Sequence, residues 1–380
     1  MKNMNVLHIG EGAHWAGIEA HLSALLGELR RMPEIDRLAL IVFNQGLLSQ
    51  RIEAMGLETI CLPRKRKFDW SVLRQITRII NTQKTSIIHT HGYLASIYGM
   101  LATIFARQRQ HHIITLHQRA AEQVSWKMRL YVKTMMFMAK IMRVHFVAVS
   151  KDVRASVLQR ISLHDDEITV IYNGIVCDDS SRMETDKAKM GLDPQKKAIG
   201  IVGRLVKGKG HHFFIRLSKA LSEIREDLEF LIIGDGPLAD EIRLNIKQMN
   251  MDGNIKMLGF RSDVIDYINC LDILTLCSDH EGIPYVVLEA LKCRTPIVST
   301  NVGGIPEVIS SGYNGILTGH GDCEEMKSKI LELLDRPSML NMITQNGYDT
   351  LLNKFSTPKM AQETVALYRK ILSEKGEKND

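Results

Sequence analysis

Thirteen short apolar runs, separated by stretches with a helical pattern, constrain the fold of this chain more than any other feature. The runs are rich in Ile, Leu and Val at consecutive positions, which is typical of strands buried on both faces of a parallel sheet. Helices between such strands cover both faces. The runs span residues 6–9, 38–43, 59–62, 86–90, 113–116, 146–149 and 168–172, and then 199–202, 230–233, 255–258, 273–277, 297–300 and 315–318.

The alternation of runs and helical stretches occurs twice, so we predict an α/β protein with two doubly wound, Rossmann-like domains. A length of 380 residues gives each domain enough chain for its own core. The polar, charge-rich stretch 177–197 lacks an apolar run and is predicted to be the linker. The domains then cover 1–176 and 198–357, and the C-terminal helical stretch 358–380 is a candidate addition to the first. Ligands of such sheets bind beyond the C-terminal ends of the strands, so we expect two facing domains to share one cleft.

The composition is that of a globular protein, with 45% hydrophobic and 24% charged residues. No apolar run approaches the ~18–20 residues that a membrane span needs. The N-terminus has the pattern of a first strand and turn and differs from a signal peptide. The six cysteines are scattered without a C-x-x-C motif, which favours free thiols in a reducing, cytoplasmic compartment over a disulfide framework or a zinc site.

Positive charge is concentrated in the first part of the chain. Residues 1–150 carry 20 Lys and Arg against 9 Asp and Glu, a net +11, whereas the remaining residues carry 29 against 34, a net −5. A basic region of this kind favours an anionic partner such as a phospholipid surface or a pyrophosphate-linked acceptor. The alternative that the excess has no specific partner stays open. No nucleic-acid-binding motif is present, so we expect no nucleic-acid partner.

Two glutamates at 281 and 289 lie in the segment SDHEGIPYVVLEALKCRTPIVSTNVGGIPEV, residues 278–308. Glu281 follows the apolar run 273–277, and Gly282 and Pro284 break the chain directly after it. Glu289 then lies about one turn into the next predicted helix. Two spaced carboxylates suit the hydroxyl groups of a sugar ring or a ribose. The glycines at 303 and 304 expose backbone N–H groups, which suits a phosphate.

A second glycine-rich loop, from Gly203 to Gly210, follows the run 199–202 and precedes a predicted helix. Arg204 and Lys209 in this loop would lie beside the helix N-terminus. Two cations and the positive end of a helix dipole suit a diphosphate. Gly234 follows the run 230–233 in a G-x-G-P turn, which is either a structural turn or a ligand contact.

These motifs together resemble the signature of the GT4-like family of retaining glycosyltransferases, which have the two-domain GT-B fold. The match consists of the E-x7-E spacing with EGIP at the first glutamate and EA at the second, then GGIPE, and the G-R-x4-K-G loop. The combination is much more specific than any single motif in it. The resemblance extends from Gly17 to Glu307 and is strongest over 198–307.

The resemblance implies a role for each matching side chain. Arg204 and Lys209 would hold the donor diphosphate and stabilise it as it leaves, Glu281 would contact the donor sugar, and Glu289 the ribose. Family members are usually described as using a front-face mechanism, in which the leaving phosphate helps to deprotonate the acceptor, so Glu281 is not assigned as a nucleophile. The N–H groups of Gly303, Gly304 and Ile305 would bind phosphate or sugar, and the turn at Gly234 would lie near the base.

Candidate residues in the first domain are fewer. Gly17 begins the first helix in the sequence A-G-I-E, where the family usually has G-G-x-E, but it still offers its N–H to a phosphate. His117 ends the run 113–116, and the resemblance places a histidine here near the transferred sugar; a structural hydrogen bond is the alternative. His89 and His91 would point to one face of a strand. No third ligand is evident beside them, so we predict no metal site.

The stretch 126–146 is predicted to be a basic helix in which Arg129, Lys133, Lys140 and Arg143 form a stripe beside a Met/Leu/Phe face. Such a helix could lie on an anionic bilayer. For its apolar face we favour the alternative of a core helix whose exposed face happens to be basic. Ser150, which follows the run 146–149, is predicted to be an N-cap.

We therefore expect a retaining, metal-independent hexosyltransferase without a cofactor. Its second domain would bind a UDP-sugar or GDP-sugar, and its first would bind a lipid-linked or cell-envelope saccharide, as in capsule or lipopolysaccharide synthesis. It would be cytoplasmic or peripheral on the membrane. The alternatives are a nucleotide-sugar epimerase of the same architecture and a non-catalytic nucleotide-sugar-binding protein. A nicotinamide dehydrogenase is disfavoured because the G-x-G-x-x-G motif is incomplete. The sugar, base, acceptor and linkage do not follow from the motifs.

Overall fold

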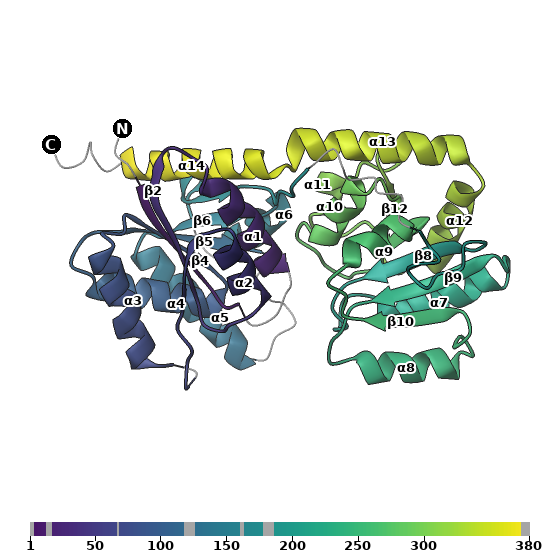
Figure 1. Cartoon of the computed structure of the whole chain (residues 1–380), viewed down its shortest axis with the longest axis horizontal. Coiled ribbons are helices and arrows are strands. Elements are labelled where there is room, and N and C mark those ends of the chain that lie inside the picture. The colour runs from purple at the N-terminus through teal and green to yellow at the C-terminus, as the bar shows by residue number, and fades with distance from the viewer. Residues whose placement is uncertain are drawn as a thin grey trace. The chain divides into compact units, whose positions relative to one another are not determined.

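The chain forms two compact units (Figure 1). The computed structural model describes residues 4–12, 17–66, 68–117, 126–159, 163–177 and 186–373, and for 126–131 the backbone alone. The first unit comprises Met1–Val176 with Ser356–Asp380, and the second comprises Cys177–Phe355.

The first unit is built on a seven-stranded sheet with the order β3-β2-β1-β4-β5-β6-β7, in which every pair of neighbours is parallel. The chain adds β2 and β3 on one side of β1 and then returns to add β4 on the other side. The direction of strand addition therefore reverses between β1 and β4. The strands are β1 (Met4–Gly10), β2 (Ile35–Val42), β3 (Glu58–Cys61), β4 (Ile87–His91), β5 (His111–Leu116), β6 (His145–Ala148) and β7 (Ile168–Val170).

Helices cover both faces of this sheet, because side chains alternate between the faces along each strand. Val6 and Ile87 pack with helices α1, α2 and the C-terminal α14. Leu7 and Ile88 pack with α3 and α4. The helices are α1 (Gly17–Leu29), α2 (Leu47–Ala54), α3 (Trp70–Thr82), α4 (Tyr93–Phe105), α5 (Trp126–Ile141), α6 (Lys151–Leu158) and α14 (Thr357–Ser373), with the short 3-10 turn η1 (Asp165–Glu167).

The second unit contains a six-stranded parallel sheet with the order β10-β9-β8-β11-β12-β13. Here the direction of strand addition reverses between β8 and β11. The two sheets confirm the predicted fold class of two doubly wound, Rossmann-like units. The strands are β8 (Lys197–Val202), β9 (Leu228–Ile233), β10 (Ile255–Gly259), β11 (Ile273–Leu276), β12 (Ile297–Thr300) and β13 (Ile316–Thr318).

One face of the second sheet packs against α7, α8 and α12, where Ile199 and Ile201 share a core with Phe214, Ile246 and Ile330. In Figure 1, α9 and α10 lie above the strands β8, β9 and β10, and α8 lies below them. The helices are α7 (His211–Ser222), α8 (Ala239–Gln248), α9 (Val264–Cys270), α10 (Tyr285–Lys292), α11 (Ile305–Val308), α12 (Cys323–Leu334) and α13 (Pro337–Lys354).

The boundaries of the units differ from those expected at the predicted linker, whereas the C-terminal helix was already a candidate addition to the first unit. The described part of the predicted linker, from residue 186, packs onto the second unit, since Lys187 forms an ion pair with Asp272 at 2.7 Å and Leu192 is buried. Lys197, expected to end the linker, begins β8. At the other end, Ser356 pairs with Ile175 across a β-bridge, and the contacts of α14 place it in the first unit.

The basic stretch over 126–146 is shorter as a helix than predicted. Helix α5 ends at Ile141, Arg143 adopts a φ of +51°, and His145 already begins β6. The apolar face of α5 lies in the core through Met135, Met136 and Ala139, as the favoured interpretation required. No helix among the described residues is long and apolar enough to cross a membrane.

Two smaller predictions are confirmed. Ser150 caps α6, because its Oγ accepts a hydrogen bond from the N–H of Val153 at 3.1 Å. The six cysteines are free thiols.

Candidate active site

The loops that follow β8 and β11 meet where the strand order of the second sheet reverses. Ile273 of β11 pairs directly with Ile199 of β8. Beyond the strand ends, the N–H of Asp279 donates to the carbonyl of Gly208 at 2.8 Å and joins the two loops. Ligands of open parallel sheets bind in the crevice at such a reversal. The topology therefore marks these two loops as the ligand site of the second unit.

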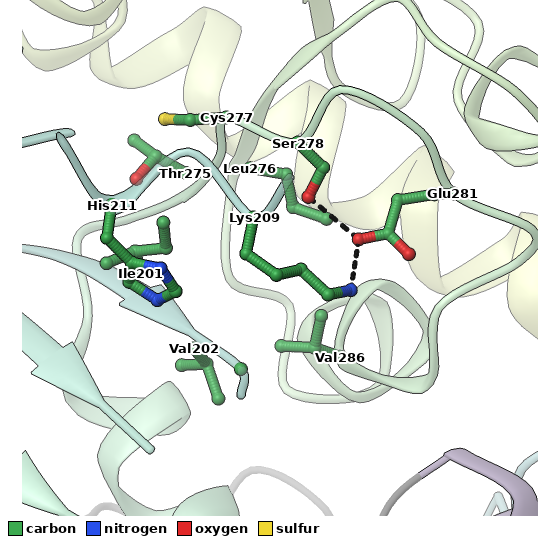
Figure 2. A pocket seen from close by; sticks show the side chains of 11 residues that line it. Ile201, Val202, Lys209, His211, Thr275, Leu276, Cys277, Ser278, Glu281 and Val286 are labelled. Atoms are coloured by element: carbon green, nitrogen blue, oxygen red, sulfur yellow. Dashed lines mark hydrogen bonds and ion pairs between the residues drawn. The ribbon is translucent and has the colours of Figure 1, made fainter. Parts of the chain in front are cut away.

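Lys209 and Glu281 form an ion pair at this point through Nζ and Oε1 (Figure 2). Ser278 donates its hydroxyl to the same oxygen at 2.7 Å, and Thr300 donates to the carbonyl of Ser278 at 2.8 Å. The Glu281 side chain is 10% exposed and that of Lys209 is 32% exposed. Among the described residues, Oε2 of Glu281 has no hydrogen-bond partner, so this oxygen is available to a ligand.

The loop after β12 supports Glu281 from its backbone side. Gly303 has a φ of +56°, and a Cβ at this position would lie 2.0 Å from the carbonyl oxygen of Glu281. Only glycine fits such an approach. The N–H of Gly304 donates to the same carbonyl at 3.0 Å. Gly303 and Gly304, the two glycines of the GGIPE motif, therefore fix the backbone position of Glu281.

This support changes the role expected for the Gly303–Gly304–Ile305 backbone. The N–H of Gly304 is bonded to Glu281, and the N–H of Ile305 is bonded to the carbonyl of Val302 at 3.1 Å. Two of the three predicted ligand donors are thus already used within the protein. The turn must close against Glu281 before the short helix α11 begins. The N–H groups of Gly304 and Ile305 therefore stabilise this turn with hydrogen bonds inside the protein.

Gly203 and Gly234 lie against each other at the ends of neighbouring strands β8 and β9. A Cβ on Gly234 would lie 1.9 Å from the carbonyl oxygen of Gly203. The turns after β8 and β9 can therefore approach each other this closely only with glycine at position 234. Gly203 also lines the pocket that contains Lys209 and Glu281. The structural alternative for the turn at Gly234 therefore has direct support, and its contact with a base stays a prediction.

Arg204 is placed differently from Lys209, although both lie in the same loop. Its side chain is exposed and it does not line the pocket that contains Lys209 and Glu281. Within the described part of the chain, its guanidinium has no ion-pair partner. The structure thus brings Lys209 and Glu281 together and leaves Arg204 free at the surface of the loop.

Glu289 lies in the second turn of α10, as predicted, and is partly buried. Burial raises the pKa of its carboxyl group to about 7, and nearby Lys292 opposes this shift. The buried hydroxyl of Tyr285, one turn earlier, has no hydrogen-bond partner among the described residues. Burial and the charge of Glu289 raise the pKa of that hydroxyl well above its ordinary value. A carboxyl group with a raised pKa and a buried phenol hydroxyl without a partner are both groups to which a ligand can form hydrogen bonds.

Sequence reasoning missed two side chains of the pocket, Ser278 and His211. His211 is the first residue of α7 and lines the pocket beside Lys209 (Figure 2). Both of its ring nitrogens are buried, and neither has a partner among the described residues. Burial, followed by the charge of Lys209, lowers its pKa to about 4, so the ring is neutral. Its position two residues after Lys209 was the only available signal.

In the first unit, Gly17 is exposed at the start of α1, and the preceding residues 13–16 lie outside the described chain. His117 directly follows β5, and its Nε2 lies 3.3 Å from Nδ1 of His91. Burial is the main cause of a His117 pKa well below the ordinary value. The structural hydrogen bond and the role near a sugar are therefore both compatible with its place at the strand end.

His89 and His91 point to one face of the sheet, as predicted, and their ring centroids are 4.6 Å apart. The expectation that no further histidine would join them is wrong. His8 of β1 and His21 of α1 complete two groups of three, His8–His89–His91 and His21–His91–His117, whose nitrogens lie within 4.8 Å of one another. Knowing the strand order β1-β4-β5 would have revealed His8, because it pairs with His89 across the sheet.

Two family models match nearly the whole chain. The model for glycosyl transferases group 1 matches residues 182–350, and the model for glycosyltransferase family 4 matches residues 15–179. These ranges correspond to the second unit and to most of the first.

Curated relatives and solved structures agree with these matches. The Escherichia coli UDP-Gal:alpha-D-GlcNAc-diphosphoundecaprenol alpha-1,3-galactosyltransferase is 23% identical over 329 residues, which is 84% of each chain. The Staphylococcus aureus capsular polysaccharide biosynthesis glycosyltransferase CapM is 25% identical over 82% of this chain and 85% of its own. Anabaena HepE in complex with UDP and glucose has a similar fold, with a TM-score of 0.85 at 19% identity over 97% of this chain and 100% of that chain.

Proposed function

This chain belongs to the GT4-like family of glycosyltransferases, and we propose that it transfers a hexosyl group from a nucleoside-diphosphate sugar to an acceptor hydroxyl with retention of the anomeric configuration and without a metal ion. The observation that carries this proposal is the Lys209–Glu281 ion pair at the strand-order reversal of the second sheet. A cation and a carboxylate at that position match the two halves of such a donor, a diphosphate and a sugar.

Lys209 would change partners during the reaction. In the free protein its ammonium group is paired with Glu281. A bound diphosphate is a stronger anion, and it gains negative charge as the bond between the sugar C1 and the phosphate oxygen breaks. Lys209 then stabilises the leaving group most strongly in the transition state, which is the condition for catalysis. The exposed Arg204 would supply a second cation, so the two side chains would take the part that a metal ion plays elsewhere.

Glu281 would hold the donor sugar. Its Oε1 is already engaged by Lys209 and Ser278, so a sugar hydroxyl would bind at Oε2. This use of the carboxylate supports a front-face reaction, in which an oxygen of the leaving phosphate takes the proton of the acceptor hydroxyl. The new bond forms on the face that the diphosphate leaves, which retains the anomeric configuration.

The nucleoside would bind along α10, beside Glu289 and the buried hydroxyl of Tyr285. An ionised carboxylate accepts two hydrogen bonds from the hydroxyls of a ribose. UDP and GDP share this ribose, and we propose that one of them is the donor nucleotide. The protein would need no cofactor besides this substrate.

We propose a lipid-linked or cell-envelope saccharide as the acceptor, bound by the basic first unit. The names of the E. coli and S. aureus relatives state a diphosphoundecaprenol acceptor and a capsular polysaccharide pathway. On α5, the exposed residues Lys133, Phe137, Lys140 and Ile141 lie on one helix face. Exposed apolar side chains among lysines suit peripheral binding to an anionic membrane. The free cysteines support the cytoplasmic side of that membrane.

The test is a thermal-shift screen with UDP-sugars and GDP-sugars, followed by incubation of the stabilising donor with membrane lipid extract. We expect a glycosylated lipid whose anomeric proton coupling matches that of the donor. Formation of an epimerised donor in the absence of acceptor would instead identify an epimerase. Donor binding without turnover in any extract would identify a non-catalytic binding protein, and an inverted product would overturn the retaining mechanism.

A further inference from the structure

Six side chains in the first unit form a continuous series of hydrogen bonds that ends at His117. They come from β1, β4, the end of β5, and the C-terminal helix α14, and they lie on the sheet face that α1 and α14 cover. The series, in order, is Thr115, His89, Tyr368, His8, His91 and His117.

The inner half of the series is completely buried. Thr115 Oγ1 lies 2.6 Å from His89 Nε2, and His89 Nδ1 lies 2.6 Å from the hydroxyl of Tyr368. Thr115, His89 and Tyr368 are each at most 2% exposed. Tyr368 therefore links β4 to a helix that the chain adds more than 250 residues later.

The outer half leads to the end of the sheet. The Tyr368 hydroxyl lies 3.3 Å from His8 Nε2, His8 Nδ1 lies 3.1 Å from His91 Nε2, and His91 Nδ1 lies 3.3 Å from His117 Nε2. His8 and His91 are buried, whereas His117 is partly exposed.

Burial keeps the imidazoles neutral. It lowers the pKa of His8 to about 3 and is the main cause of the low pKa values of His89, His91 and His117. The neighbouring His21 on α1 is lowered to about 4. A neutral imidazole has one N–H donor and one acceptor nitrogen. Each ring in the series must therefore donate to one neighbour and accept from the other, so the whole series runs in one of two directions.

Thr115 decides between the two directions. Within the described chain, its hydroxyl has one hydrogen-bond partner, His89 Nε2. If the series ran inward, this nitrogen would carry the proton, and the buried Thr115 O–H would have no acceptor. If the series runs outward, Thr115 donates to His89, His89 to Tyr368, and so on to His117. The partly exposed His117 tolerates either direction, since a ligand or solvent can satisfy its outer nitrogen.

We propose that Thr115, acting through His89, Tyr368, His8 and His91, fixes His117 as the tautomer protonated at Nδ1. His117 then accepts from His91 at Nε2 and offers an N–H donor at the carboxyl end of β5. The intervening residues are positioning residues for that donor.

Under the proposed function, this tautomer assigns His117 a definite task. It donates a hydrogen bond to an oxygen of the bound substrate, and its outward nitrogen has no lone pair with which to take a proton. The proton of the acceptor hydroxyl must then leave by another route, as the front-face reaction requires.

The first test needs no substrate. In full-length protein with ¹⁵N-labelled histidine, two-bond ¹⁵N–¹H correlation spectra report the tautomer of each ring. We expect the Nδ1–H pattern for His117 in the wild type. Thr115→Val, which removes the deciding hydroxyl, and Tyr368→Phe, which interrupts the series but keeps the ring, should each shift His117 partly or fully to the Nε2–H pattern.

Thr169→Val is the matched control, because it removes a threonine–histidine hydrogen bond of 2.9 Å to His145 outside the series. It should leave His117 unchanged. An Nε2–H tautomer in the wild type overturns the proposal, as does an Nδ1–H tautomer that persists in both series variants. Stoichiometric zinc bound by His91 and His117 also overturns it, since the metal would require an unprotonated Nδ1 on His91.

The second test measures turnover and is separate from the first. Thr115→Val should lower kcat by about tenfold with a smaller change in KM, because a donor to the reacting substrate is partly lost. The profile of kcat between pH 6 and 8 should show no step from His117 in the wild type, since it stays neutral beside His8, His21, His89 and His91. If His117 has the Nδ1–H tautomer but the protein transfers no glycosyl group, the proposal on the hydrogen-bond series stands and only the proposed function is refuted.

Discussion

Lys209 and Glu281 are 72 positions apart in the sequence, yet their side chains form the ion pair at the carboxyl edge of the second sheet. The pair joins the loop after β8 to the loop after β11. It places a cation and an anion where the two halves of a nucleotide sugar would each need one. In the free protein each charge also offsets the other's burial cost.

Removing either partner should therefore abolish most of the transfer activity. We expect Lys209→Ala and Glu281→Ala each to lower kcat by ~10²-fold or more, because each side chain would act on the transition state. Lys207→Ala, which removes an exposed cation from the same loop, should retain nearly full activity. Steady-state kinetics with the donor found in the screen checks this. Near-normal turnover in both alanine variants would defeat the site assignment.

The raised pKa of Glu289 predicts that donor binding strengthens as the pH rises toward neutrality. With a pKa of about 7, the carboxyl group is mostly protonated at pH 6, whereas hydrogen bonds from a ribose favour the ionised form. The affinity for UDP should rise by about tenfold from pH 6 to pH 8, with release of a proton. Calorimetry in buffers of different ionisation enthalpy measures both. In Glu289→Gln, the affinity for UDP should vary with pH only as far as the phosphate itself titrates. If the pH profile of the affinity is the same in this variant as in the wild type, Glu289 does not belong to the ribose site.

The raised pKa of Glu289 also predicts that the free energy of unfolding decreases as the pH rises. Glu289 is protonated in both the folded and the unfolded state below pH 4.5, so its contribution is flat there. Between about 4.5 and about 7 the unfolded chain has lost the proton and the folded chain has kept it, so stability falls as the pH rises. Glu289→Gln should remove this loss. Melting temperatures of the two proteins across that range would then diverge toward pH 7, and parallel curves would contradict the raised pKa.

Gly303 should tolerate no side chain. Gly303→Ala places a Cβ 2.0 Å from the carbonyl oxygen of Glu281, so the loop must move and carry the carboxylate with it. We expect a clear loss of both melting temperature and activity. Gly312→Ala is the matched control, because Gly312 also has a positive φ, of +81°, but no described atom lies within 4 Å of its Cβ. That variant should cost about 1 kcal/mol and leave transfer intact. Equal effects of the two substitutions would refute the contact with Glu281.

The exposed face of α5 should bind anionic membranes. Replacing Lys133 and Lys140 with Glu and Phe137 and Ile141 with Ser should weaken binding to vesicles that contain phosphatidylglycerol by tenfold or more, since each lysine near such a surface contributes about 1 kcal/mol. Co-sedimentation measures the binding, with neutral phosphatidylcholine vesicles for comparison.

The control for this experiment lies on α8 of the second unit. Leu244→Ser combined with Lys247→Glu removes an exposed apolar side chain and a nearby lysine there. It should leave vesicle binding unchanged. Binding that survives the four changes on α5 would exclude this face as the membrane contact.

Much of the fold could be predicted from the sequence, because strands buried on both faces leave an unmistakable apolar pattern. All thirteen predicted runs are strands, with ends that differ by no more than three residues. The order of the strands could not be predicted, since it depends on tertiary packing. That order is what brings His8 beside His89 and the loop of Lys209 beside that of Glu281.

The candidate site was only partly predictable for the same reason. Motif spacing identified Lys209, Glu281 and Glu289, because each motif is local in sequence. It could not show that Gly304 and Ile305 use their N–H groups within the protein, or that Arg204 lies outside the pocket. His211 and Tyr285 carry buried nitrogen and oxygen atoms without partners, which is a property of packing and has no sequence signature.

The assignment of α14 to the first unit determines when that half of the molecule can be completed. Met360, Val365 and Tyr368 fill the core beneath α1, and a ribosome adds them only after the whole of the second unit. In a nascent chain that has reached Val176, α1 and α2 can cover their part of this sheet face, but the part that α14 covers is still exposed. The half that is synthesised first is the half whose core closes last.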